Sequence, residues 1–242
     1  MIDFWRSSVG KKNIVAVTGA ILIGYLILHM LGNLNSAFGP GAQEPRVDWY
    51  AHWLRDFGEP LLPHGFVVWA VRVILLGAIV THITGIVQLT KRNKAARPAN
   101  FPARRIGRSV ESIAMLGTGA LLLAFIVFHI LQFTTLSIHV TPVEHGEVYA
   151  NLYWVFQKWF FLAIYLVALI LLGSHLRHGI WSAFQTLGLD SPSRNAKLRH
   201  GATALTVVLV VGFAAVPVLF FTDVLDPPHT TALLTSLSGA FS

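Results

Sequence analysis

The stretch that decides the fold is WFFLAIYLVALILLGSHLRHGIWSAFQTLG, residues 159–188. It opens as a long apolar run without charge between Trp159 and Gly173, and a histidine, His175, precedes the first arginine, Arg177. An imidazole inside a membrane helix usually has a purpose, because an unsatisfied polar group in hydrocarbon costs several kcal/mol. The small residues before His175 leave room for a large flat group. The stretch therefore predicts a membrane helix that carries a haem ligand.

The composition is typical of an integral membrane protein. Of the 242 residues, 54% are hydrophobic and only 12% are charged, and the mean hydropathy is +0.62, whereas a soluble domain of this size needs more charge. The net charge of +7 comes from short loops between apolar runs, so it does not indicate nucleic-acid binding. The absence of cysteine excludes disulfides and any iron–sulfur cluster held by this chain's own thiolates.

Five stretches are long enough to cross about 30 Å of hydrocarbon at about 1.5 Å per residue. We expect a single all-α transmembrane domain over residues 1–242, and Pro217 is expected to stop or kink its last helix. No internal repeat and no separate soluble domain is evident, and the first apolar run is too long for a cleavable signal peptide. The expected helices cover about 14–38, 66–90, 112–136, 149–177 and 202–222.

The loop charges predict how this five-helix bundle is oriented. Fourteen of the 18 basic residues lie on one side, before the first helix, between the second and third, and after the fourth. The other side carries eight acidic residues and only two basic loop residues. By the positive-inside rule we expect a cytoplasmic N-terminus and a C-terminus outside.

Four of the eleven histidines lie deep in the expected spans, one on each of the first four helices: His29, His82, His129 and His175. Their distances from the charged helix ends, at about 1.5 Å per residue, place His29 and His129 in the outer half of the membrane and His82 and His175 in the inner half. Two facing imidazoles bind the iron of a b-type haem, so two pairs at two depths predict an electron path of two haems. A helix–helix hydrogen bond explains one buried histidine equally well, but not four that match in depth.

Metal-ligating histidines normally donate their other N–H to a nearby acceptor. Thr81 and Ser174 adjoin the inner pair, and helical carbonyls one turn back are equally able to accept. Arg72 lies 10 residues before His82, about 15 Å farther out, which is the depth of the outer pair. Both a haem propionate and snorkelling to the interface account for this cation.

The inner and outer loops supply further candidates. Arg177 and His178 follow the inner ligand of the fourth helix, where contact with a haem propionate, contact with a partner subunit and ordinary positive-inside charge all stay open. A quinone needs hydrogen-bond donors and a proton route to water, and outer-side residues offer both, although inner-side residues are not ruled out. The outer candidates are Glu44, Asp48, Asp56 and Glu59, with Trp49 and Tyr50.

Four segments resemble the cytochrome b membrane-anchor subunit of succinate dehydrogenases and fumarate reductases, and more narrowly its single-chain, five-helix, di-haem type. The resemblance covers about Lys11 to Arg199, and the HMLGNL and HLRHGIWSAFQTLG stretches are its most specific parts. The segments are KKNIVAVTGAILIGYLILHMLGNL, VTHITGIVQLTKRNKAARP, MLGTGALLLAFIVFHILQF and SHLRHGIWSAFQTLG.

The resemblance implies a multi-pass subunit of a prokaryotic inner-membrane complex. A flavoprotein subunit of that complex oxidises succinate, an iron–sulfur subunit passes the electrons to this anchor, and the anchor delivers them to menaquinone. It implies two haem b groups, with His82 and His175 on the proximal iron and His29 and His129 on the distal iron. The chain would then be an enzyme subunit without a succinate site of its own, in contact with lipid and quinone, and the whole complex is compatible with a homo-oligomer.

Some di-haem fumarate reductases carry a glutamate two residues before the ligand of the fourth helix, as a proton route, but this chain has Gly173 there. Two rival functions stay open at this point. One is the di-haem cytochrome b of another quinone-linked complex, such as a hydrogenase, formate dehydrogenase or nitrate reductase. The other is a haem-free transporter or anchor, with the deep histidines as a proton relay.

Overall fold

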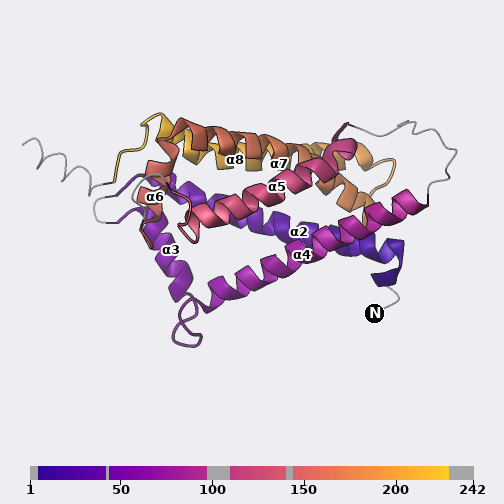
Figure 1. Ribbon diagram of the computed structural model, residues 1–242, viewed down its shortest axis with the longest axis horizontal. Coiled ribbons are helices and arrows are strands. Elements are labelled where there is room, and N and C mark those ends of the chain that lie inside the picture. The colour runs from indigo at the N-terminus through magenta and orange to yellow at the C-terminus, as the bar shows by residue number, and fades with distance from the viewer. Residues whose placement is uncertain (1–4, 42–43, 97–109, 140–143, 229–242) are drawn as a thin grey trace, which may run out of the picture.

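The computed structural model describes residues 5–41, 44–96, 110–139 and 144–228, and within these residues the regular structure is all helical, without a strand (Figure 1). Five helices are long and apolar enough to cross a membrane, which confirms the all-α, five-span prediction. The elements are α2 (Ser8–Asn33), the 3-10 helix η1 (Leu34–Phe38), α3 (Arg46–Asp56), α4 (Phe66–Ala95), α5 (Val110–Phe133), α6 (Val148–Phe156), α7 (Trp159–Thr186) and α8 (Asn195–Phe221).

The spans pack as two pairs that a fifth helix supports. Helix α2 lies along α4 and α5 lies along α7, while α7 also contacts both α2 and α8 and so joins the pairs (Figure 1). Large apolar side chains cover the outer surfaces, and Leu28, Val73 and Ile170 are 65%, 66% and 70% exposed. Apolar surface on this scale needs a lipid environment, because water would penalise it heavily.

The two ends of the bundle differ in charge. The starts of α2 and α8 and the ends of α4 and α7 lie at one end of the bundle, which we call the basic end (Figure 1). The opposite end, which we call the acidic end, carries α3 and α6 (Figure 1). Part of the sequence on which the orientation rests, Arg97, Arg104, Arg105 and Arg108, lies outside the described residues, as does His229.

The predicted fourth helix, 149–177, is wrong as a single element. The chain forms a short helix, α6, and then α7, because Lys158 takes an extended conformation with φ −96° and ψ 112° between them. The preceding Gln157 side chain donates to the carbonyl of Phe220 at 2.6 Å and to Asp223 Oδ1 at 2.8 Å. The break therefore follows from contacts with the end of α8. Pro217 was expected to stop or kink the last helix; it does not stop it, because it lies inside α8, which continues to Phe221.

The acidic end is closed by a buried contact between α3 and α6. Asp48 is only 4% exposed, and its Oδ1 accepts a hydrogen bond from the backbone N–H of Tyr149 at 2.9 Å. Burial raises the pKa of Asp48 to about 6, despite the opposing backbone hydrogen bonds from Tyr149 and Val148. The carboxyl group thus caps the first turn of α6 and joins two segments about 100 residues apart.

Candidate functional site

The four deep histidines occupy two levels of the bundle. His29 on α2 and His129 on α5 form the outer level, toward the acidic end, and His82 on α4 and His175 on α7 form the inner level. All four rings are half-buried. Thr18 contacts His82, and His29 lies eleven positions after Thr18 on the same helix. At about 1.5 Å per residue the levels are therefore about 16 Å apart along α2.

The outer rings are neighbours, with centroids at the spacing of two imidazoles that share one metal. The ring centroids of His29 and His129 lie 5.8 Å apart, and the ring planes cross at 79°. Metal–imidazole bonds are about 2 Å long, so two imidazoles on opposite sides of one metal place their centroids roughly 6 Å apart. The outer pair fits this arrangement.

Aromatic side chains surround the outer pair. Tyr25 stacks on His29 with centroids 5.3 Å apart, and Phe213 of α8 lies 5.7 Å from the same ring. Phe125 and Phe133 flank His129 at 6.0 and 5.5 Å. Such a shell limits water access, and water access influences the redox potential of a metal at the site.

A hydrogen-bond chain determines which nitrogen of His129 is available. The Tyr165 hydroxyl lies 3.0 Å from His129 Nδ1 and donates its one proton to Gln132 Oε1 at 2.8 Å. The Tyr165 oxygen must therefore accept from His129 Nδ1–H, which leaves Nε2 unprotonated. Gln132 is 1% exposed, and its Nε2 has no hydrogen-bond partner within the described residues. This buried donor at the outer level fits a site that receives an acceptor group, because a buried polar atom without a partner is costly.

The inner rings lie against two neighbouring helices. His82 Nδ1 is 3.1 Å from the carbonyl oxygen of Val15 and 3.2 Å from Thr18 Oγ1, both on α2. His175 Nδ1 is 3.2 Å from Thr118 Oγ1 on α5. Each of these acceptors lies on a different helix from the histidine that it contacts. The expected acceptors, Thr81, Ser174 and the carbonyls one turn back, would have been on the same helix as the histidine. The two inner rings are close enough to interact electrostatically.

Glycines allow this close approach. A Cβ atom added at Gly19 would lie 3.5 Å from His82 Cε1, and one at Gly119 would lie 3.3 Å from His175 Cε1. Each imidazole therefore rests on a bare stretch of helix beside the threonine that contacts it. Within the described residues no hydrogen bond involves Nε2 of His82, His129 or His175, so these nitrogens are available to a ligand.

Comparison of α2 with α5 shows an internal repeat, which the sequence analysis missed. TGAILIGYLILH, residues 18–29, matches TGALLLAFIVFH, residues 118–129, at the Thr-Gly-Ala start and at the final histidine. The structure gives the two copies equivalent contacts: the threonine contacts an inner histidine, and an aromatic residue four positions before the outer histidine lies against that ring. The repeat is thus structural as well as sequential.

The candidate propionate contacts occupy different environments. The exposed Arg72 places its guanidinium 4.9 Å from the centroid of Trp69, and it interacts electrostatically with Tyr25, which stacks on His29. Arg72 therefore lies at the depth of the outer level. At the basic end Arg177 is exposed, and the ring of His178 lies 6.1 Å from that of Trp181.

The outer quinone candidates do not converge on one point. Glu44 pairs with His52 at 2.9 Å, while Asp56 and Glu59 pair with His64 at 3.1 and 3.3 Å, all on exposed surface. The remaining candidates differ in position: Asp48 serves as the cap of α6.

Trp49 is 54% exposed. Tyr50 lies nearest the outer level, because its ring lies 3.0 Å from the position of a Cβ added to Gly32, three residues after His29.

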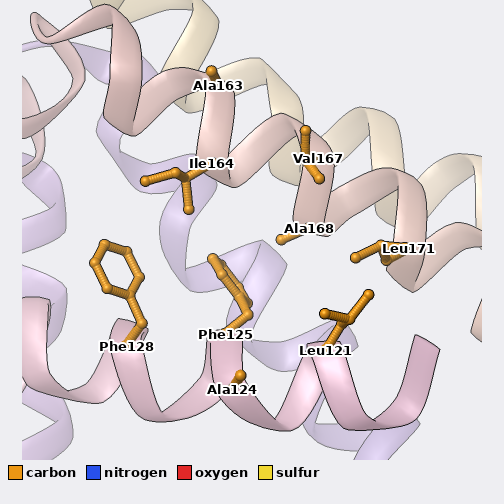
Figure 2. A pocket seen from close by; sticks show the side chains of 9 residues that line it. All are labelled: Leu121, Ala124, Phe125, Phe128, Ala163, Ile164, Val167, Ala168 and Leu171. Atoms are coloured by element: carbon orange, nitrogen blue, oxygen red, sulfur yellow. The ribbon is translucent and has the colours of Figure 1, made fainter. Parts of the chain in front are cut away.

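A lateral groove between α5 and α7 has a volume of about 430 Å³. Figure 2 shows Leu121, Phe125 and Phe128 extending from α5 toward α7, where Ile164, Ala168 and Leu171 line the other wall. All of its lining residues are apolar, so the groove offers no donor for a propionate or a quinone carbonyl. It is an apolar surface groove that shares Phe125 with the aromatic shell.

Comparison with known proteins gave no match: no family model, no curated protein and no solved structure is significantly similar to this chain. Its function has to be inferred from its own residues. Sequence reasoning identified the four histidines and Arg72, but it missed Thr18, Thr118, Tyr165 and Gln132. The repeated Thr-Gly-Ala triplet eleven residues before an outer histidine was the signal that was available for the two threonines.

Proposed function

We propose that this chain is the di-haem cytochrome b membrane anchor of a succinate:quinone oxidoreductase. The observation that carries the proposal is the arrangement of four histidines on four helices at two levels, with the outer rings 5.8 Å apart. A haem-free proton relay requires polar side chains between the levels, and the ten residues between Thr18 and His29 on α2 are apolar apart from Tyr25.

Each pair has a defined role in this function. His82 and His175 hold the proximal haem, nearer the iron–sulfur subunit, and His29 and His129 hold the distal haem. The two haem b groups supply one-electron chemistry, while the protein supplies ligands, orientation and a low-dielectric shell. Gln132 and Arg72 lie at the outer level and are suited to hydrogen-bond and neutralise carboxylates there.

The remaining assignments follow from charge. The basic end faces the cytoplasm of a prokaryotic cell and contacts the iron–sulfur subunit, which in turn binds the flavoprotein subunit; Arg177 and His178 lie at that end. Menaquinone is reduced toward the acidic end, near Tyr50. Electrons then cross the membrane against a potential worth about 2.3 kcal/mol per charge per 100 mV, so the direction of turnover depends on that potential.

The test is to purify the complex in detergent through a tag on this chain and to add succinate under anaerobic conditions. We expect the flavoprotein and iron–sulfur subunits to copurify, succinate to reduce the haems, and a menaquinone analogue to reoxidise them. Reduction by hydrogen or formate, with succinate inactive, would instead assign the chain to another quinone-linked complex. A preparation without a Soret band would exclude both assignments and leave a transporter or a structural anchor.

A further inference from the structure

The two copies of the repeat treat the inner histidines in the same way. Thr18 contacts His82 and Thr118 contacts His175, each at 3.2 Å between Oγ1 and Nδ1. Each contact joins residues more than 50 positions apart, so it does not arise from local helix geometry. In both copies the next residue is the glycine on which the imidazole rests.

Donor and acceptor counting points to one placement of the inner protons. A threonine hydroxyl has a single proton. Thr18 Oγ1 lies 2.8 Å from the carbonyl oxygen of Ile14, one turn back, and Thr118 Oγ1 lies 3.2 Å from that of Ala114. With each hydroxyl proton on its own helix carbonyl, the threonine oxygen accepts from histidine Nδ1–H. The Val15 carbonyl, 3.1 Å from His82 Nδ1, can only accept, which gives the same tautomer independently.

We propose that Thr18 and Thr118 are matched positioning residues that hold His82 and His175 as Nδ1–H tautomers, each with an unprotonated Nε2 ready to bind one shared metal. This inference rests on the proposed haem function and extends it to residues on α2 and α5 that contact the inner histidines. Helix α2 thereby carries the outer ligand His29 and supports the inner ligand His82. Helix α5 likewise carries His129 and supports His175.

The two threonines do not contribute equally to holding their histidines. His82 Nδ1 has a second acceptor, the Val15 carbonyl, whereas Thr118 is the only hydrogen-bond partner of His175 Nδ1 in the described part of the chain. Loss of the Thr118 hydroxyl therefore leaves His175 free to change tautomer. Loss of the Thr18 hydroxyl leaves His82 partly held.

The experiment compares Thr18→Val, Thr118→Val and both serine variants in the full chain. Valine keeps the branched shape and replaces the hydroxyl with a methyl group, while serine keeps the hydroxyl and lacks the methyl group. The matched control is Thr206→Val, because Thr206 is 6% exposed and its hydroxyl hydrogen-bonds only to its own helix, at 2.8 Å from the carbonyl of Ala202.

Haem retention during detergent washing and the low-temperature EPR signal of each haem are measured in the purified complex. Nitrogen-15 NMR of labelled histidines in haem-free chain reports the tautomers without any cofactor.

We expect Thr118→Val to weaken retention of the inner haem about 10-fold, the lower end of the range for residues that support metal ligands. Thr18→Val should have a smaller effect, serine should restore retention, and Thr206→Val should match the wild type. In haem-free chain, Thr118→Val should change the His175 tautomer alone. If the wild type holds two haems and Thr118→Val behaves like Thr206→Val in EPR and NMR, the inference is overturned while the proposed function stands. A wild type without haem overturns the proposed function, and the metal-binding half of the inference with it.

Discussion

The inner and outer levels of this bundle are built from the same repeated helix segment but have different surroundings. At the inner level both histidines contact a threonine and rest on a glycine of the repeat, so the support is nearly symmetric. At the outer level His129 is held by Tyr165, which donates in turn to Gln132, whereas His29 has only ring contacts within the described residues. The contrast indicates that the repeat establishes two histidine pairs, and that the other helices then give each pair its own surroundings.

The largest effect should come from removing one ligand of each level. We expect His82→Ala to lose the inner haem and His129→Ala to lose the outer haem, because iron with one axial imidazole missing is held weakly in a detergent-exposed bundle. The measurement is haem per chain by pyridine haemochrome, together with low-temperature difference spectra. His52→Ala, on exposed surface beside Glu44, is the control and should retain both haems. Loss of the same spectral component in both variants would contradict the two-level arrangement.

A glycine substitution should damage the inner level alone. A Cβ atom at Gly85 would lie 2.6 Å from Val15 Cγ2, so Gly85→Ala should push α4 away from α2 and destabilise the protein by up to about 3 kcal/mol. Gly77→Ala on the same helix meets no atom within 4 Å and should be neutral or slightly stabilising. Thermal unfolding in detergent and the EPR signals of both haems check this prediction. Equal behaviour of the two variants would mean that α2 and α4 are not in close contact.

At the acidic end, Asp48 should make the free energy of unfolding depend on pH. Its pKa is raised from 3.8 to about 6 by burial, so between these values the folded chain keeps a proton that the unfolded chain has lost. Stability should therefore fall as the pH rises from about 4 to 6, by about 2 kcal/mol for this one group. Asp48→Asn keeps an acceptor for the Tyr149 N–H and stays neutral.

The Asp48→Asn variant should therefore match the wild type near pH 4 and exceed it above pH 6, as measured by thermal unfolding across that range. A constant difference between the two proteins at every pH would show that Asp48 is not buried as a protonated acid. The inner haem should be unaffected in either case, because the contact lies at the acidic end.

The smallest effect should come from the Tyr165 hydroxyl. Tyr165→Phe removes the acceptor of His129 Nδ1 and one partner of Gln132, at a cost of about 1 kcal/mol. We expect the EPR signal of the outer haem to shift and that of the inner haem to stay unchanged. Tyr25→Phe keeps the ring that stacks on His29 and serves as the control. A shift of the inner signal in Tyr165→Phe would show that the levels are not independent.

Sequence reasoning was most successful for features that follow from apolar runs and from position along a helix. Five apolar runs predicted five spans, and distance from charged helix ends paired His29 with His129, whose rings are indeed neighbours. It failed where long-range contacts decide. The break before α7 depends on hydrogen bonds from Gln157 to the end of α8, which no local pattern indicates.

The details of the site show the same limit. Asp48 belongs to an acidic loop in sequence, but in space it caps α6, about 100 residues later. Thr118 lies 57 positions from His175, so only helix packing relates them. The four candidate ligands were recognisable because a histidine inside an apolar run is unusual. Their hydrogen-bond partners are threonines and a tyrosine, which are ordinary residues in membrane helices.

The central claim is that this chain binds two haems, one at each histidine level. Its most direct test is the pyridine haemochrome content of the purified wild-type complex, per mole of this chain, with a dithionite-reduced minus oxidised spectrum. The account predicts two b haems per chain. One haem would contradict the two-level arrangement, and none would remove the electron path altogether.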